Sequence, residues 1–195
     1  MYEYINKTLK SAWDRSELSN RDIIQIGIQI IETAESIHNS GYVHTDLKLD
    51  NIMINRRNKV FIIDYGNAEK FLLPDGTHRP NGSGPEKFVN VHFGSKNALN
   101  KDTLSRRDDI IQIIYNLICL FNSFKPLQAY IGTDDDELTL FSEFKKNASA
   151  KDFCGLNKTP IFTEVLNECY EMGYDATPNY VKLRFMLKKI LLQFC

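Results

Sequence analysis

The chain has 195 residues, a length that suits one domain or one large part of a two-lobed domain. Hydrophobic residues make up 43% and charged residues 25%, which are the proportions of a globular protein and exclude a disordered one. The formal net charge of −1 gives no reason to expect a nucleic acid or a membrane surface as a partner.

The clearest helical pattern covers residues 19–40. Ser19 and Asp22 have the spacing of a capping box, and isoleucines recur at helical intervals between positions 23 and 37. Gly41 supplies a stop signal directly after this pattern. Because further isoleucines widen the apolar face, we expect the helix to be buried on most of its sides.

Two short β-prone runs follow the helix. Residues 52–54 and 60–63 flank five polar residues, which predicts a β-hairpin over 52–63. The glycines and prolines of 73–85 predict a loop.

The second half of the chain has mostly helical patterns. The consecutive aspartates at 134–136 indicate a solvated loop or a helix start. Pro178 suits the first turn of the last helix. The predicted helices cover 108–124, 161–172 and 178–194. The sequence therefore predicts a mainly α fold with a small β-hairpin set into it.

Polar residues suited to phosphoryl transfer surround this hairpin. One loop carries three of these residues within six positions, namely Asp46, Lys48 and Asn51. Asp64 lies at the end of the returning strand. Because the hairpin folds that strand back, both acids can face one site. Asp46 suits the acceptor of the hydroxyl proton, and Lys48 suits the cation that neutralises the phosphoryl group. Asn51 and Asp64 offer the hard oxygen ligands that Mg²⁺ requires.

These motifs resemble those of protein kinases. Residues 44–51, HTDLKLDN, resemble the catalytic loop HRDLKxxN, and residues 64–66, DYG, resemble the DFG motif. Residues 105–109, SRRDD, are similar to the SRRDDLESLG segment of casein kinase 1, and the tyrosine of DYG is similar to that of vaccinia-related kinases. Residues 176–180, ATPNY, resemble the DxKPDYxxL segment that closes the casein kinase 1 domain.

The resemblance implies a serine/threonine protein kinase that transfers the γ-phosphate of ATP to a protein hydroxyl, with ATP and Mg²⁺ as cofactors. Asp46 and Lys48 would be catalytic. Lys48, Asn51 and Asp64 would contact the nucleotide, the last two through the metal. Structural support would come from His44, Gly66 and Asp109, and Asp109 would hold the catalytic-loop backbone from the central helix.

Residues 1–195 would form one partial kinase domain, with the catalytic loop over 42–51 and the activation segment over 64–97. A kinase also needs a glycine-rich loop, a strand lysine and a helix glutamate from its N-terminal lobe. The chain contains no GxGxxG and begins after these elements. We therefore expect a C-terminal lobe whose N-terminal lobe is absent or separate, and which is inactive or very weak alone.

Two positions depart from the family pattern. Thr45 replaces the catalytic-loop arginine, which removes the usual clamp on a phosphorylated activation segment. Residues 90–95 resemble the family's TARYAS run, and Ser95 corresponds to its serine. His92 replaces the arginine of that run.

Two other functions remain open. A pseudokinase or truncated paralogue would keep the fold and bind partner proteins. A small-molecule phosphotransferase of the aminoglycoside or choline kinase type would share an HxDxxxxN loop, but Lys48 and residues 105–109 favour a protein kinase.

The four cysteines form no CxxC pair and no metal-ligand spacing. No secretory signal or membrane span is evident in the sequence. We therefore expect reduced thiols in a cytoplasmic or nuclear protein.

Overall fold

The computed structural model of the chain describes residues 7–84, 89–121 and 135–194. Its helices are α1 (Leu9–Asp14), α2 (Asn20–Asn39), α3 (Lys96–Leu99), α4 (Arg106–Phe121), α6 (Asp135–Asn147), α7 (Ala150–Leu156), α8 (Thr163–Tyr170) and α9 (Tyr180–Leu191). Its strands are β1 (Lys7–Thr8), β2 (Tyr42–Val43), β3 (Ile52–Ile54), β4 (Val60–Ile62) and β5 (Glu69–Lys70). Short 3₁₀ turns cover 49–51, 65–67, 160–162 and 192–194.

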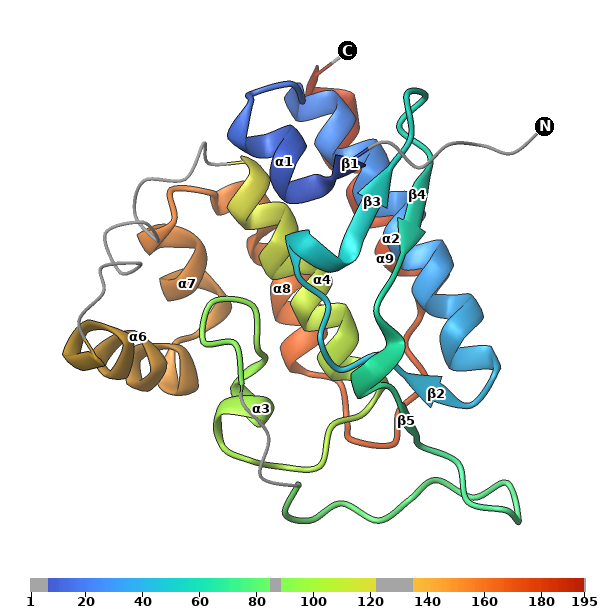
Figure 1. Ribbon diagram of the computed structural model, residues 1–195. Coiled ribbons are helices and arrows are strands. Elements are labelled where there is room, and N and C mark those ends of the chain that lie inside the picture. Colours follow the sequence, from blue (N-terminus) through green and yellow to red (C-terminus); the bar gives the residue numbers. More distant parts are fainter. Residues whose placement is uncertain (1–6, 85–88, 122–134, 195) are drawn as a thin grey trace.

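The predicted hairpin is confirmed and belongs to a three-stranded antiparallel sheet in the order β1-β3-β4. Ile52 pairs with Ile62 and Ile54 pairs with Val60, and all four side chains are buried. Figure 1 shows the hairpin lying in front of the helical body, with α2 and α9 behind it. The predicted mainly α fold with a small β-hairpin is therefore correct.

The core forms where α2 packs against α4 and α9. The predicted capping box of α2 is confirmed: Ser19 Oγ accepts a hydrogen bond from the Asp22 amide, and the Asp22 carboxylate accepts one from the Ser19 amide. Gly41 follows the helix with a φ of +85°, a conformation that glycine adopts without strain. The isoleucines at 23, 24, 26, 30 and 31 are buried, as the pattern predicted.

Several predicted helix ends were wrong by two residues. Helix α4 begins at Arg106 instead of 108, α8 begins at Thr163 instead of 161, and α9 begins at Tyr180. Pro178 lies before α9 because the Asn179 side chain caps that helix, accepting a hydrogen bond from the Lys182 amide. Residues 122–124 of the predicted 108–124 helix lie outside the described residues.

Sequence reasoning missed β1 and the helices α1, α3 and α7. They are short, so few apolar repeats mark them. The helix start suggested by the aspartates is confirmed, since α6 begins at Asp135. Cys119, Cys154 and Cys169 are buried free thiols, whereas Cys195 lies outside the described residues. Within the described ranges, no helix is long and apolar enough to cross a membrane.

The packing of α2 against α4 depends on a glycine. A Cβ atom added at Gly27 would lie 2.6 Å from Leu117 Cδ1, and the Leu117 side chain is fully buried. Overpacking of this kind costs about 1–3 kcal/mol, which exceeds the helix-propensity gain of about 1 kcal/mol from glycine to alanine.

We therefore expect Gly27→Ala to lower the free energy of unfolding by up to about 2 kcal/mol in urea denaturation. Gly155→Ala is the matched control in α7, because nothing lies within 4 Å of its added Cβ. That variant should be neutral or slightly stabilising. Equal stability of the two variants would mean that α2 and α4 can separate without cost.

Candidate active site

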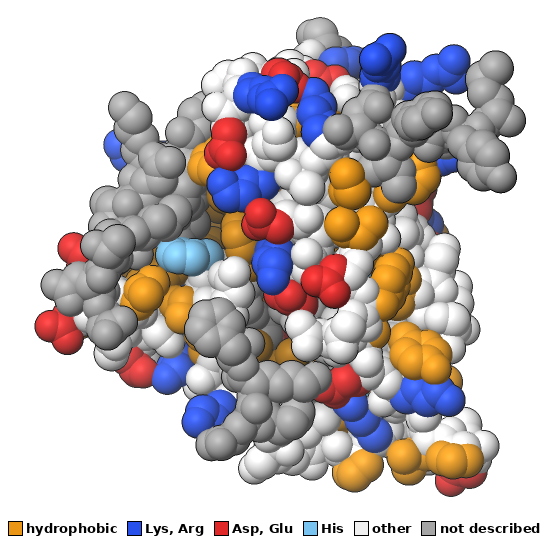
Figure 2. Space-filling model, viewed as in Figure 1, with side chains coloured by type: hydrophobic (Ala, Val, Ile, Leu, Met, Phe, Trp, Pro, Cys, Tyr) orange, Lys and Arg blue, Asp and Glu red, His pale blue; other side chains and the backbone are white. Residues whose placement is uncertain are grey.

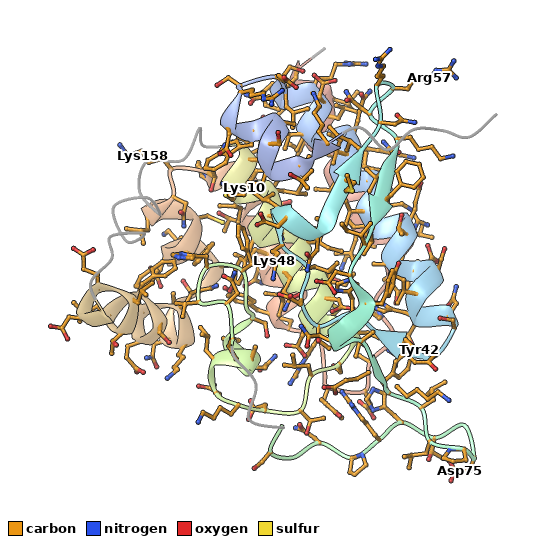
Figure 3. The ribbon with its side chains drawn as sticks, in the orientation of Figure 1. Lys10, Tyr42, Lys48, Arg57, Asp75 and Lys158 are labelled. Carbon is orange, nitrogen blue, oxygen red and sulfur yellow. The ribbon has the colours of Figure 1, made fainter. Side chains whose placement is uncertain are left out.

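The predicted catalytic loop runs from β2 to the hairpin and lies against α4. Lys48 lies near the centre of the molecule, between the hairpin and α4 (Figure 3). Figure 2 shows acidic and basic side chains side by side down the middle of the same face. The loop has only a 3₁₀ turn at 49–51, so contacts from other elements must hold its backbone.

Asp109, in the first turn of α4, supplies the first of these contacts. Its Oδ2 accepts a hydrogen bond from the His44 amide at 2.6 Å, and its Oδ1 accepts one from the Thr45 amide at 2.8 Å. The Nε2 atom of His38, on α2, lies 2.9 Å from Oδ2. His38, His44 and Asp109 are buried and Thr45 is half-buried, so the contacts join α2, α4 and the loop through one buried carboxylate.

Two further side chains of α4 extend this attachment along the helix. Gln112 Oε1 accepts a hydrogen bond from the Leu47 amide at 2.8 Å, and its Nε2 donates to the Thr45 carbonyl at 2.9 Å. Asn116 Nδ2 donates to the Leu47 carbonyl at 3.0 Å. Sequence reasoning did not assign them a role, although both interrupt an apolar helix on the face of Asp109.

Thr45 adopts an unusual backbone conformation, with a φ of +68°. This left-handed region is strained for a β-branched residue and persists only where the surroundings impose it. The contacts from Asp109 and Gln112 impose it here. The Thr45 hydroxyl donates to the Asn67 carbonyl at 2.9 Å, which ties the loop to the segment that follows Asp64.

Asp46, Lys48 and Asn51 meet at the end of the loop. Lys48 Nζ lies 2.7 Å from Asp46 Oδ2, and both side chains remain partly exposed. Asn51 Nδ2 donates to the Asp46 carbonyl at 2.9 Å and to Asp46 Oδ2 at 3.2 Å. Two donors thus hold one carboxylate oxygen of Asp46 in a defined position.

The hairpin brings Asp64 to the same end of the sheet. The Ile63 amide donates to the Asn51 carbonyl at 2.9 Å. Asp64 therefore directly follows the residue that pairs with Asn51. Asp64 has a φ of +62° and is exposed, and its Oδ1 accepts a hydrogen bond from the Gly66 amide at 3.3 Å. A Cβ at Gly66 would lie 3.2 Å from that oxygen, closer than most side chains tolerate.

Asn51 and Asp64 carry side-chain oxygens of the type that binds a magnesium ion. Among the residues that the structure describes, the Asn51 side chain acts only as a hydrogen-bond donor, which leaves its Oδ1 without a donor there. Mg²⁺ in nucleotide sites takes one or two such protein oxygens and completes its shell with phosphate and water. Within the described ranges, no three His, Cys, Asp or Glu side chains form a site that would hold a metal alone.

His44 links the loop to the DYG motif. Its buried ring places Nε2 3.1 Å from the Ile63 carbonyl, and this carbonyl can only accept, so Nε2 carries the proton. The ring also meets Tyr65 edge to face, with centroids 5.1 Å apart. His44 thus contacts the residues on both sides of Asp64.

A pocket of about 310 Å³ opens beside Asp46. Residues 45–48 form one wall, and Val89, Asn90, Phe93 and Gly94 form another. The far end of this activation segment is attached to α4, because Ser95 Oγ donates to Asp108 Oδ1 at 2.6 Å. Burial raises the pKa of the Asp108 carboxyl, although its hydrogen bonds oppose that shift. Residues 85–88 of the segment lie outside the described ranges.

Comparisons with known proteins find protein kinases among the relatives of this chain. The protein kinase domain model matches residues 1–84. A probable casein kinase I homolog of Encephalitozoon cuniculi is 28% identical over 167 residues, which cover 85% of this chain and 52% of the relative. A probable serine/threonine-protein kinase of Dictyostelium discoideum is 30% identical over 84% of this chain and 33% of its own length. The B1 kinase of vaccinia virus (strain Ankara) is 27% identical over 89% of this chain and 60% of its own length.

The fold and these matches define a protein kinase-like domain. Within that class, the matched relatives include two probable casein kinase I homologs, in agreement with the resemblance noted in the sequence. The chain spans about half of the first of these relatives and a third of the second.

The role of Asp109 can be tested through stability. Asparagine offers one acceptor oxygen where aspartate offers two, so Asp109→Asn must leave at least one buried N–H facing another donor. Hydrogen bonds to charged groups contribute about 1.5–3 kcal/mol, and we expect a loss of that size in the free energy of unfolding. Amide exchange at His44 and Thr45 should also accelerate.

Asp50→Asn is the control for Asp109→Asn. Asp50 lies in the same loop but is exposed, so its substitution should leave stability and exchange unchanged. Unchanged amide exchange in Asp109→Asn would show that the loop keeps its shape without this carboxylate.

Proposed function

We propose that this chain forms the catalytic part of a serine/threonine protein kinase of the casein kinase 1 type, which transfers the γ-phosphate of ATP to a protein hydroxyl. The observation that carries the proposal is the contact of Asp46 with Lys48 and Asn51 beside an open pocket that Asp46 and Lys48 line. Asp64 directly follows Ile63, whose amide donates to the Asn51 carbonyl. The family relationship supports the same chemistry.

Asp46 would accept the proton of the acceptor hydroxyl. Lys48 and Asn51 hold its Oδ2, and its carboxylate lines the pocket, which is large enough to admit a serine or threonine side chain. Lys48 would also place its positive charge near the transferring group. Positioning and charge stabilisation of this kind supply most of the rate enhancement in phosphoryl transfer.

Asn51 Oδ1 and the Asp64 carboxylate would hold Mg²⁺ and, through it, the phosphates of ATP. When bound, the magnesium nucleotide supplies the phosphoryl group and neutralises part of its charge. The left-handed backbone of Asp64 and the Gly66 amide hold the carboxylate in place. A protein that only binds partners is the alternative, and it would require neither the metal ligands nor the base.

Nucleotide binding tests the metal ligands. We expect Asp64→Asn to weaken Mg²⁺-dependent ATP binding by at least about tenfold, since loss of even an outer-shell contact costs that much at metal sites. Isothermal titration of the purified chain with ATP, with and without Mg²⁺, measures this effect.

The control for this titration is Asp75→Asn. Asp75 lies in an exposed loop far from Lys48 (Figure 3), so this variant should bind the nucleotide like the wild-type chain. Equal binding by Asp64→Asn and wild type would remove Asp64 from the metal site.

Turnover tests the base. Asp46→Asn in the full-length protein should reduce peptide phosphorylation by about 10²–10⁴-fold, the contribution typical of general base catalysis, while ATP affinity stays within a factor of about two. The initial rate of ³²P transfer to a serine peptide measures it. Equal rates would exclude Asp46 as the base. Nucleotide binding without any transfer by the wild type would favour the partner-binding alternative.

A further inference from the structure

Lys145, in the last turn of α6, is a fully buried lysine. Buried ammonium groups in proteins are ordinarily paired with a carboxylate, because removal of an isolated charge from water is costly. Among the residues that the structure describes, no carboxylate pairs with Lys145. Its burial must therefore be offset by other contacts.

Two backbone carbonyls and the rings of Tyr115 and Phe141 provide those contacts. Lys145 Nζ donates to the Val91 carbonyl at 2.8 Å and to the His92 carbonyl at 2.7 Å. The same nitrogen lies 4.2 Å from the centre of the Tyr115 ring, within range of a cation–π interaction. Tyr115 belongs to α4, so Lys145 joins α6, α4 and the activation segment at one point.

The two carbonyls belong to a tight turn at 90–94. Asn90 Oδ1 accepts hydrogen bonds from the His92 and Phe93 amides, and the Asn90 carbonyl accepts one from the Gly94 amide at 2.6 Å. The inward N–H groups of the turn are thus satisfied within it. The carbonyls of Val91 and His92 point toward α6, where Lys145 Nζ donates a hydrogen bond to each of them.

This turn is also a wall of the pocket beside Asp46. Asn90, Phe93 and Gly94 line the pocket, whereas Val91 and His92, between them, supply the carbonyls to Lys145. One side of the turn therefore faces the candidate acceptor site and the other faces the buried ammonium group. Figure 1 shows α6 beside the segment that leads to α3.

We propose that Lys145 is a positioning residue: its side-chain nitrogen holds the turn at 90–94 in the shape that receives the acceptor peptide next to Asp46. This inference rests on the proposed kinase function for its effect on peptide binding, but the contact itself is independent of activity. The charge of His92 adds little to the turn, because burial and the nearby Lys145 lower the pKa of its imidazole.

Lys145→Met separates this role from packing. Methionine has a similar length and apolar volume but donates no hydrogen bond, so the two carbonyls lose their partner. Loss of these bonds corresponds to about tenfold faster exchange of the His92, Phe93 and Gly94 amides. The adjacent Lys146→Met is the control, since Lys146 pairs with Glu143 at the surface. It should leave exchange at the turn unchanged.

A kinetic measurement on the full-length protein completes the test. Lys145→Met should raise the KM for a serine peptide by about tenfold, while the KM for ATP changes by less than about twofold. Lys145→Arg keeps a cationic donor at the position and should recover part of the peptide KM. General destabilisation of the protein would not raise the KM for the peptide while leaving the KM for ATP nearly unchanged.

Asn90→Ala provides a second approach if Lys145→Met does not fold. It removes the Asn90 oxygen that organises the same turn from within, so it should reproduce both the faster exchange and the raised peptide KM with a nearly unchanged KM for ATP. Unchanged exchange at the turn in either variant overturns the proposal, and so does faster exchange with an unchanged peptide KM. Faster exchange in a protein that transfers no phosphate would support the contact while the kinase function fails.

Discussion

The contact between the Asp109 carboxylate and the backbone of the catalytic loop is the constraint on which the rest of the site depends. The loop has little regular structure of its own, and Thr45 within it adopts a strained left-handed conformation. The buried Asp109 carboxylate accepts hydrogen bonds from the amides of His44 and Thr45, and bonds to a carboxylate screened from water are strong and costly to lose. The direction of the Asp46 side chain follows from this attachment.

The polar residues of α4 repeat the same principle along the helix. Asp109, Gln112 and Asn116 lie on one face and satisfy backbone groups of the loop one turn at a time. Each would be costly in an apolar helix without a partner, and each supplies the partner that an irregular loop segment needs. Helix and loop therefore stabilise each other, and the candidate catalytic residues are attached to the core through the loop.

The activation segment is attached by related means. Asp108 accepts a hydrogen bond from Ser95 at the end of the segment. Lys145 donates hydrogen bonds to two carbonyls of the turn before it. The pocket beside Asp46 thus lies between two walls that different helices hold. A rigid pocket of this kind suits a reaction in which positioning supplies most of the rate enhancement.

The sequence by itself determined α2, its capping box and the β-hairpin, because periodicity, capping and short turns are local rules. It also supplied the set of catalytic candidates, since Asp46, Lys48, Asn51 and Asp64 share one loop and one hairpin whose geometry the spacing implies. It could not assign partners to Gln112, Asn116 or Lys145. A polar residue in a helix shows that some group must satisfy it, but not which distant backbone will. That choice depends on how α4 and α6 pack against the loop and the activation segment, and only the tertiary structure decided it.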